Sequence, residues 1–182
     1  MRADARRNLE RLVAVAAEVV AEQGADASME EIARRAGVGS ATLHRHFGGR
    51  TAMLEAVFES SIDTVCAKSD DLLDHGDPGE ALRTWLSAVV AHATKNRGLG
   101  AALMMSAERG SEFHARITQA GNQLLDRAQL HHAADPEATI GDLLGLVNAI
   151  SLTTESDTAA DPGRAGRLLG LVIRGVTPAP VS

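Results

Sequence analysis

The sequence predicts an all-α protein of about nine helices, with an N-terminal three-helix domain followed by a larger helical domain. Apolar residues recur at helical spacing along most of the chain, and no segment shows the two-residue alternation of a strand. The 182 residues are 45% hydrophobic but only 2% aromatic, with no Tyr, a composition typical of helical proteins with packed cores.

The first predicted helix ends at Gly24. Its inward face carries apolar residues at i, i+3, i+4, i+7, i+10 and i+11, namely Leu9, Leu12, Val13, Ala16, Val19 and Val20. Charged residues interrupt this run, so it predicts an amphipathic helix rather than a signal peptide. No uninterrupted apolar stretch approaches the roughly twenty residues that span a bilayer, and we expect no membrane segment.

Residues 28–47 predict two short helices joined by a tight turn. Ser28 and Glu31 have capping-box spacing, which marks the start of the first of these helices. Gly37 stands where a helix would end with positive φ, and Gly39 can serve as the N-cap of the next helix. This arrangement is typical of a helix-turn-helix, whose second helix enters the major groove of DNA.

The second short helix has one inward and one outward face. Leu43 and Phe47 are one turn apart and should pack inward. The side chains expected on the exposed side are Ser40, Ala41, Thr42, His44, Arg45 and His46. Hydroxyls and an Arg near a helix N-terminus suit phosphates and base edges. The alternative is an ordinary helical hairpin with a solvated charged face.

The charge distribution fits a DNA reader at the N-terminus better than the net charge of −6 suggests. Residues 1–50 contain eight Lys and Arg against seven Asp and Glu, a net of +1. Residues 51–182 contain ten against seventeen, a net of −7. The asymmetry has the expected sign, although its size at the N-terminus is modest.

The later helices are separated by Gly, Pro and Asp turns. We expect them to follow Arg50, Pro78, Leu99, Ser111, Pro136 and Pro162. The predicted organisation is a DNA-binding domain at 1–49, a helical effector-binding and dimerisation domain at 50–177, and a tail at 178–182.

Three motifs occur in order along the N-terminal part: Glu-Gln-Gly24 after an Ala-rich helix, the run Ser28-x-Glu-Glu-Ile-Ala-x-x-Ala-Gly-Val38, and Thr42-Leu-His-Arg-His-Phe47 followed by Arg50. Together they make residues 12–58 resemble the DNA-binding domain of TetR/AcrR-family transcriptional regulators. The chain departs from the family pattern at His44, where Tyr is usual, and at Arg50, where Lys is common.

The resemblance implies a sequence-specific DNA-binding regulator, most simply a dimeric repressor that a small-molecule effector releases from its operator. By matching position, it implies phosphate contacts from Ser28, Thr42, His44, His46 and Arg50, with Ser40, Ala41 and Arg45 nearer to base edges. The alternative is an all-α small-molecule-binding or enzymatic protein with a vestigial helix-turn-helix.

The C-terminal helices carry the expected dimer interface. Gly141 and Gly145 are four residues apart beside large apolar side chains, so another helix can approach closely. The resemblance implies that the last two helices pair with those of a second subunit. The residues expected in this interface are Ile140, Leu143, Leu144, Val147, Leu168, Leu169 and Val172. The alternative is that they pack within one subunit.

An effector cavity is expected among the middle helices, because Met adapts to ligands and Asn or Thr can orient them. The candidate lining residues are Trp85, His92, Met104, Met105, Phe113, Asn122, Asn148 and Thr153. Ordinary core positions are the alternative for each of them.

The sequence contains no recognisable catalytic or metal-binding motif, and we expect no enzyme activity, no metal and no cofactor. The lone Cys66 excludes an intramolecular disulfide and fits the reducing cytoplasm, where we expect the protein to act.

Overall fold

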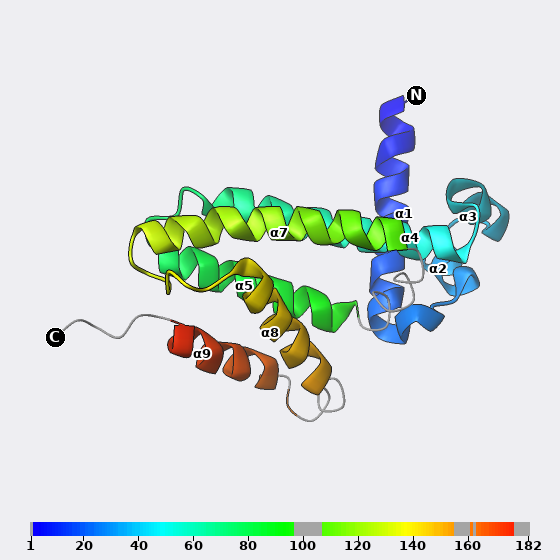
Figure 1. Cartoon of the computed structure of the whole chain (residues 1–182). Coiled ribbons are helices and arrows are strands. Elements are labelled where there is room, and N and C mark those ends of the chain that lie inside the picture. Colours follow the sequence, from blue (N-terminus) through cyan, green and yellow to red (C-terminus); the bar gives the residue numbers. More distant parts are fainter. Residues whose placement is uncertain (1, 97–106, 155–160, 162, 177–182) are drawn as a thin grey trace. The chain divides into compact units, whose positions relative to one another are not determined.

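A computed structural model describes the backbone of residues 2–96, 107–154, 161 and 163–176, and the side chains in these ranges except at positions 2–5, 25, 107–111 and 176. These residues form eight α-helices, one 3-10 turn and no strand, which confirms the all-α prediction (Figure 1). None of these helices is both long enough and apolar enough to cross a bilayer. Three parts of the prediction lie outside the described residues. They are most of the helix expected after Leu99, the residues Met104 and Met105, and the tail at 178–182.

Most helices begin and end close to the predicted turn residues. Their bounds are α1 (Arg2–Gln23), the 3-10 turn η1 (Gly24–Asp26), α2 (Met29–Ala36), α3 (Ser40–Phe47), α4 (Arg50–Leu72), α5 (Pro78–Lys95), α7 (Ala107–Leu130), α8 (Ile140–Thr153) and α9 (Arg164–Val176). The exception is the break expected at Ser111, which lies inside α7, a helix that already begins at Ala107.

The chain divides into two compact units: Met1–Ser61 with Lys95–Ser111, and Ile62–Thr94 with Glu112–Ser182. Helix α4 is continuous through this division and contributes its first part to the first unit. The first unit extends beyond the expected boundary at residue 49, because Met53, Leu54 and Val57 of α4 lie in its hydrophobic core.

The core of the first unit holds the helix-turn-helix in place. Leu12 of α1, Ile32 of α2 and Leu43 of α3 are fully buried in one cluster. Most inward positions expected from the sequence are buried, but Leu9 of α1 is exposed and Val13 is only partly buried. Val38 packs against the same cluster from the turn.

The core of the second unit is built from α4, α5, α7, α8 and α9 around Trp85. The Trp85 indole is fully buried, and its Nε1 donates a hydrogen bond to the Val65 carbonyl at 3.1 Å. Gly121 of α7 lies directly against it. A Cβ atom at position 121 would be 2.7 Å from Trp85 Cη2 and 2.5 Å from Ile140 Cδ1, so this approach requires a residue without a side chain.

Candidate DNA-binding surface

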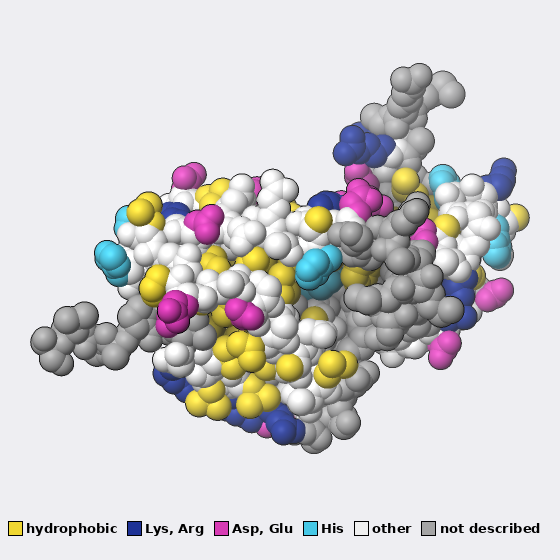
Figure 2. Space-filling model, viewed as in Figure 1, with side chains coloured by type: hydrophobic (Ala, Val, Ile, Leu, Met, Phe, Trp, Pro, Cys, Tyr) yellow, Lys and Arg dark blue, Asp and Glu magenta, His cyan; other side chains and the backbone are white. Residues whose placement is uncertain are grey.

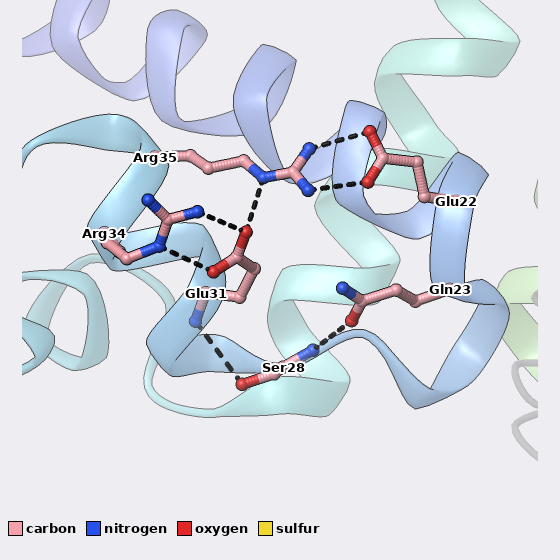
Figure 3. Close-up of polar contacts among 6 residues, drawn as sticks. All are labelled: Glu22, Gln23, Ser28, Glu31, Arg34 and Arg35. Atoms are coloured by element: carbon pink, nitrogen blue, oxygen red, sulfur yellow. Dashed lines mark hydrogen bonds and ion pairs between the residues drawn. The ribbon is translucent and has the colours of Figure 1, made fainter.

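Helix α2 begins at the predicted residue, but with only half of the expected capping box. Ser28 Oγ accepts a hydrogen bond from the Glu31 amide at 3.3 Å, as predicted. The Glu31 carboxylate does not return to the Ser28 amide. It accepts hydrogen bonds from Arg34 and Arg35, and the Ser28 amide donates to Gln23 Oε1 at 3.2 Å (Figure 3). Gln23 at the end of α1 thus completes the cap.

The turn between α2 and α3 is a Schellman motif. Gly37 adopts φ 66° and ψ 32°, the left-handed conformation that glycine enters without steric strain. Its amide donates to the Arg34 carbonyl at 3.2 Å, and the Val38 amide donates to the Ala33 carbonyl at 3.0 Å. Gly39 is extended and is the N-cap of α3, as expected; its carbonyl accepts the first two helical hydrogen bonds at 2.8 and 3.2 Å.

Helix α3 has a buried side and an exposed side. Leu43 and Phe47 are buried and anchor the helix to the core. At about 100° per residue, Ala41 and Arg45 lie on the opposite side of the helix, and both are exposed. This places a small side chain and a guanidinium one above the other at the centre of the outward face.

Arg45 lies along its own helix. Its Nε donates to the Ala41 carbonyl and its Nη2 donates to Thr42 Oγ1, each at 3.3 Å. Thr42 and His44 flank this central line, with Thr42 half-buried and His44 exposed, and the predicted contact residues Ser40 and His46 are exposed as well. Long hydrogen bonds of this kind are readily exchanged for acceptors on a ligand.

Two predicted phosphate contacts already have protein partners. Ser28 Oγ caps α2 and donates to Glu30 Oε2 at 3.0 Å. Arg50 Nη2 lies 3.2 Å from the carboxylate of Asp26, whose side chain is completely exposed. A surface pair of this kind is weak, so phosphate can replace the carboxylate. Contact with DNA stays a prediction for both residues.

The described members of the predicted effector set differ in exposure. Trp85 and Phe113 are buried, and Trp85 is packed on Gly121 as described above. Three others are exposed: Asn122, Asn148 and Thr153.

His92 is a largely buried candidate on α5. Burial lowers the pKa of its imidazole to about 4. The ring is therefore neutral at physiological pH, a form that can both donate and accept hydrogen bonds. An effector cavity stays a prediction for His92 and for the other candidates.

The residues expected at the dimer interface mostly face the interior of one subunit. Ile140, Leu143, Val147 and Leu169 are buried in the core of the second unit, and Leu144, Leu168 and Val172 pack against it. The strongest apolar periodicity marked the face that the chain itself buries. The large hydrophobic side chains that α8 and α9 expose are Leu146, Leu152 and Leu171. Contact of the expected residues with a second subunit stays a prediction.

In the described part of the chain, no group of three or more His, Cys, Asp or Glu side chains is arranged to hold a metal ion. Cys66 is partly buried, and burial raises the pKa of its thiol, which disfavours the reactive thiolate.

Known protein families match both units of this chain. A family model described as "Bacterial regulatory proteins, tetR family" matches residues 12–57, and one described as "Transcriptional regulator SbtR-like, C-terminal domain" matches residues 77–178. The TetR transcriptional regulator SCO0520 from Streptomyces coelicolor is 32% identical, with a TM-score of 0.79 over 94% of this chain and 99% of that chain.

Two further proteins are similar over most of their length. A TetR transcription regulatory protein from Mycobacterium vanbaalenii is 28% identical, with a TM-score of 0.75 over 97% of this chain and 99% of that chain. The HTH-type transcriptional regulator SrpR from Pseudomonas putida is 28% identical over 166 residues, which cover 81% of this chain and 75% of SrpR.

Proposed function

Because the chain belongs to the TetR family of transcriptional regulators, we propose that it is a homodimeric repressor that a small-molecule effector releases from a two-fold symmetric operator. Family membership makes the protein a DNA-binding transcriptional regulator and not an enzyme. The proposal depends above all on the outward face of α3, where Ala41 and Arg45 are exposed opposite Leu43 and Phe47. It places the repressor in the cytoplasm, with its DNA.

In this proposal α3 enters the major groove with its central line towards the bases. The small side chain of Ala41 allows the helix backbone to approach closely, and it can contact a thymine methyl group. Arg45 can donate two hydrogen bonds to O6 and N7 of a guanine. Thr42 and His44, on the flanks of the helix, are placed to contact phosphates on either side of the groove.

A second copy of the chain is the proposed occupant of the exposed face of α8 and α9. Figure 2 shows hydrophobic side chains gathered over these helices and bordered by Lys and Arg side chains. Leu152 and Leu171 are 62% and 59% exposed in the single chain. A Cβ atom added at Gly145 of α8 would meet no other atom within 4 Å, so a helix from another subunit has room to approach.

Dimerisation also has a physical motive in DNA binding. One eight-residue helix makes few contacts, and two copies on a two-fold operator double them. Adjacent half-sites in the major groove are about 34 Å apart, so both α3 helices bind only when their separation is close to this value. An effector that binds better to a dimer with another separation would lower the population of the DNA-binding form.

DNA binding by the purified dimer tests the proposal. We expect a gel shift with the DNA upstream of the protein's own gene, and a weaker affinity for random DNA at equal salt. A folded dimer that shifts neither DNA at low salt would instead favour a vestigial helix-turn-helix on a small-molecule-binding protein.

The effector is tested with the same complex. Small molecules that co-purify with the protein can be released by denaturation and identified by mass spectrometry. Adding an identified compound back should dissociate the protein–DNA complex at a concentration near its own dissociation constant, and an unchanged complex would contradict its role as effector.

A further inference from the structure

The first unit contains a set of polar contacts that join α1 to α2, and the DNA-reading face does not include them. Arg35 of α2 forms a forked pair with Glu22 of α1, from Nη1 to Oε1 at 2.7 Å and from Nη2 to Oε2 at 2.6 Å (Figure 3). The remaining nitrogen, Nε, donates to Glu31 Oε1 at 2.7 Å. All three nitrogens of the Arg35 guanidinium are therefore engaged with carboxylates.

A second contact joins the same helices nearer to the turn. Arg11 Nη2 of α1 donates to the Ala36 carbonyl at 2.7 Å in a partly buried position. Ala36 is the last residue of α2. Its carbonyl belongs to the final turn, where no N–H group of the helix itself is available as a donor. Arg11 thus holds the point at which α2 ends and the turn to α3 begins.

The environment of Arg35 argues against a direct contact with DNA. Hydrogen bonds from Arg34 and Arg35 lower the pKa of Glu31 to about 2, and the hydrogen bond from Arg35 lowers the pKa of Glu22. Both carboxylates stay ionised at neutral pH and balance the positive charge. A phosphate that approached Arg35 would meet two negative charges already bound to it.

The turn that follows depends on such external support. Gly37 and Gly39 contribute no side chains, and between them only Val38 packs against the core. The direction of α3 is therefore set by how α2 lies on α1, together with the burial of Leu43 and Phe47.

We propose that Arg35 and Glu22, together with Arg11, are positioning residues for DNA recognition: they hold α2 against α1 so that α3 presents Arg45 in one orientation. This inference rests on the proposed operator binding. When only part of the population has the binding orientation, the apparent dissociation constant rises in inverse proportion to that part. In a dimer, each subunit raises the apparent dissociation constant by this factor, so the two factors multiply.

Four variants separate positioning from a phosphate contact. Arg35→Met and Glu22→Gln each remove the pair but change the charge in opposite directions. Arg34→Met is the matched control, because it removes the same charge as Arg35→Met but only the contact of Arg34 with Glu31 of its own helix. Arg35→Lys tests rescue, because an ammonium can keep one of the two bonds to Glu22.

The measurement is the affinity for operator and random DNA as a function of salt, at a temperature where circular dichroism shows every variant folded. Positioning predicts that Arg35→Met and Glu22→Gln weaken operator binding about three- to tenfold, from a factor of about two to three in each subunit. It also predicts that the affinity for random DNA and the salt slope are unchanged. The double variant of Arg35→Met and Glu22→Gln should bind the operator no more weakly than either single variant. Arg35→Lys should partly restore operator binding, and Arg34→Met should have little effect.

Two results would overturn the inference. A phosphate contact predicts that Arg35→Met weakens both DNAs and reduces the salt slope by about 0.9 for each arginine, whereas Glu22→Gln tightens binding. A merely structural surface pair predicts wild-type DNA binding by every folded variant. Wild-type protein that fails to bind its upstream DNA would overturn the proposed function. This failure is distinguishable from failure of the positioning inference, because it is seen in the wild type before any variant is compared.

Discussion

Replacing Gly121 by alanine should destabilise the second unit, although alanine is the better helix former. Gly121 is buried in the middle of α7, against Trp85 of α5 and Ile140 at the start of α8. The added methyl group would enter a space that these two side chains already fill. The substitution therefore tests whether the tight packing around Trp85 is a structural requirement of the core.

The magnitude follows from two opposing effects. An alanine in place of a helical glycine stabilises by about 1 kcal/mol. Overpacking a core costs about 1–3 kcal/mol. Here the new Cβ would lie 2.5 and 2.6 Å from Ile140 Cδ1 and Cγ1, and 2.7 Å from Trp85 Cη2.

The cost should lie in the upper part of that range. The Trp85 ring cannot swing away without losing its hydrogen bond to the Val65 carbonyl. We expect a net destabilisation of about 1–2 kcal/mol. The melting temperature should fall by about 2–8 °C for a chain of this size.

The assay is urea unfolding followed by fluorescence at fixed protein concentration, because Trp85 is the single Trp of the chain and reports on this packing directly. Ile140→Val removes the atom nearest to the new methyl group and normally costs about 0.5–1.5 kcal/mol. In the Gly121→Ala background it should cost less than this, or stabilise. A Gly121→Ala protein more stable than the wild type would refute the reasoning, since helix propensity alone would then account for the result.

Three further predictions concern the DNA, the dimer and pH. Arg45→Ala should weaken operator binding by about 1–3 kcal/mol and random-DNA binding less, measured by fluorescence anisotropy; an equal loss on both DNAs would make Arg45 a phosphate contact. Leu152→Glu or Leu171→Glu should yield folded monomers in analytical ultracentrifugation. The control Leu130→Glu, at a 78% exposed position on α7, should leave the dimer intact. Leu152→Glu and Leu171→Glu proteins that remain dimeric would refute the proposed interface. Burial lowers the pKa of His92 from 6.5 to about 4. Between these two pH values the unfolded chain binds a proton at His92 and the folded protein does not. The free energy of unfolding should therefore fall as the pH drops from 6.5 to about 4, by at most about 3 kcal/mol. His92→Gln should flatten that dependence in denaturation curves between pH 4 and 7, and an unchanged dependence would contradict the assignment.

The helix-turn-helix could be located from the sequence because its signals act within one helical turn. Ser28 bonds to an amide three residues on, Gly37 adopts the left-handed conformation that ends α2, and Gly39 opens α3. The alternation of Leu43 and Phe47 with polar residues also identified the outward face of α3 correctly. Such preferences need no information about distant parts of the chain.

The partners of the charged residues could not be predicted in the same way. Glu31 has the spacing of a reciprocal capping box, but its carboxylate binds Arg34 and Arg35, and Gln23 of the preceding helix takes its place at Ser28. A long flexible side chain chooses among all partners within reach, and neighbouring helices supply some of them.

The sequence alone therefore determined the helical fold, the ends of α2 and α3 and the outward face of α3, because local hydrogen bonding and helical periodicity decide these features. Tertiary packing decided which side of α8 and α9 faces inward, since both sides carry Leu residues and periodicity cannot distinguish a chain's own core from a partner's surface. It also decided that Arg35 binds Glu22, thirteen residues away, and that Trp85 fits over Gly121, because these contacts exist only once separate helices pack together.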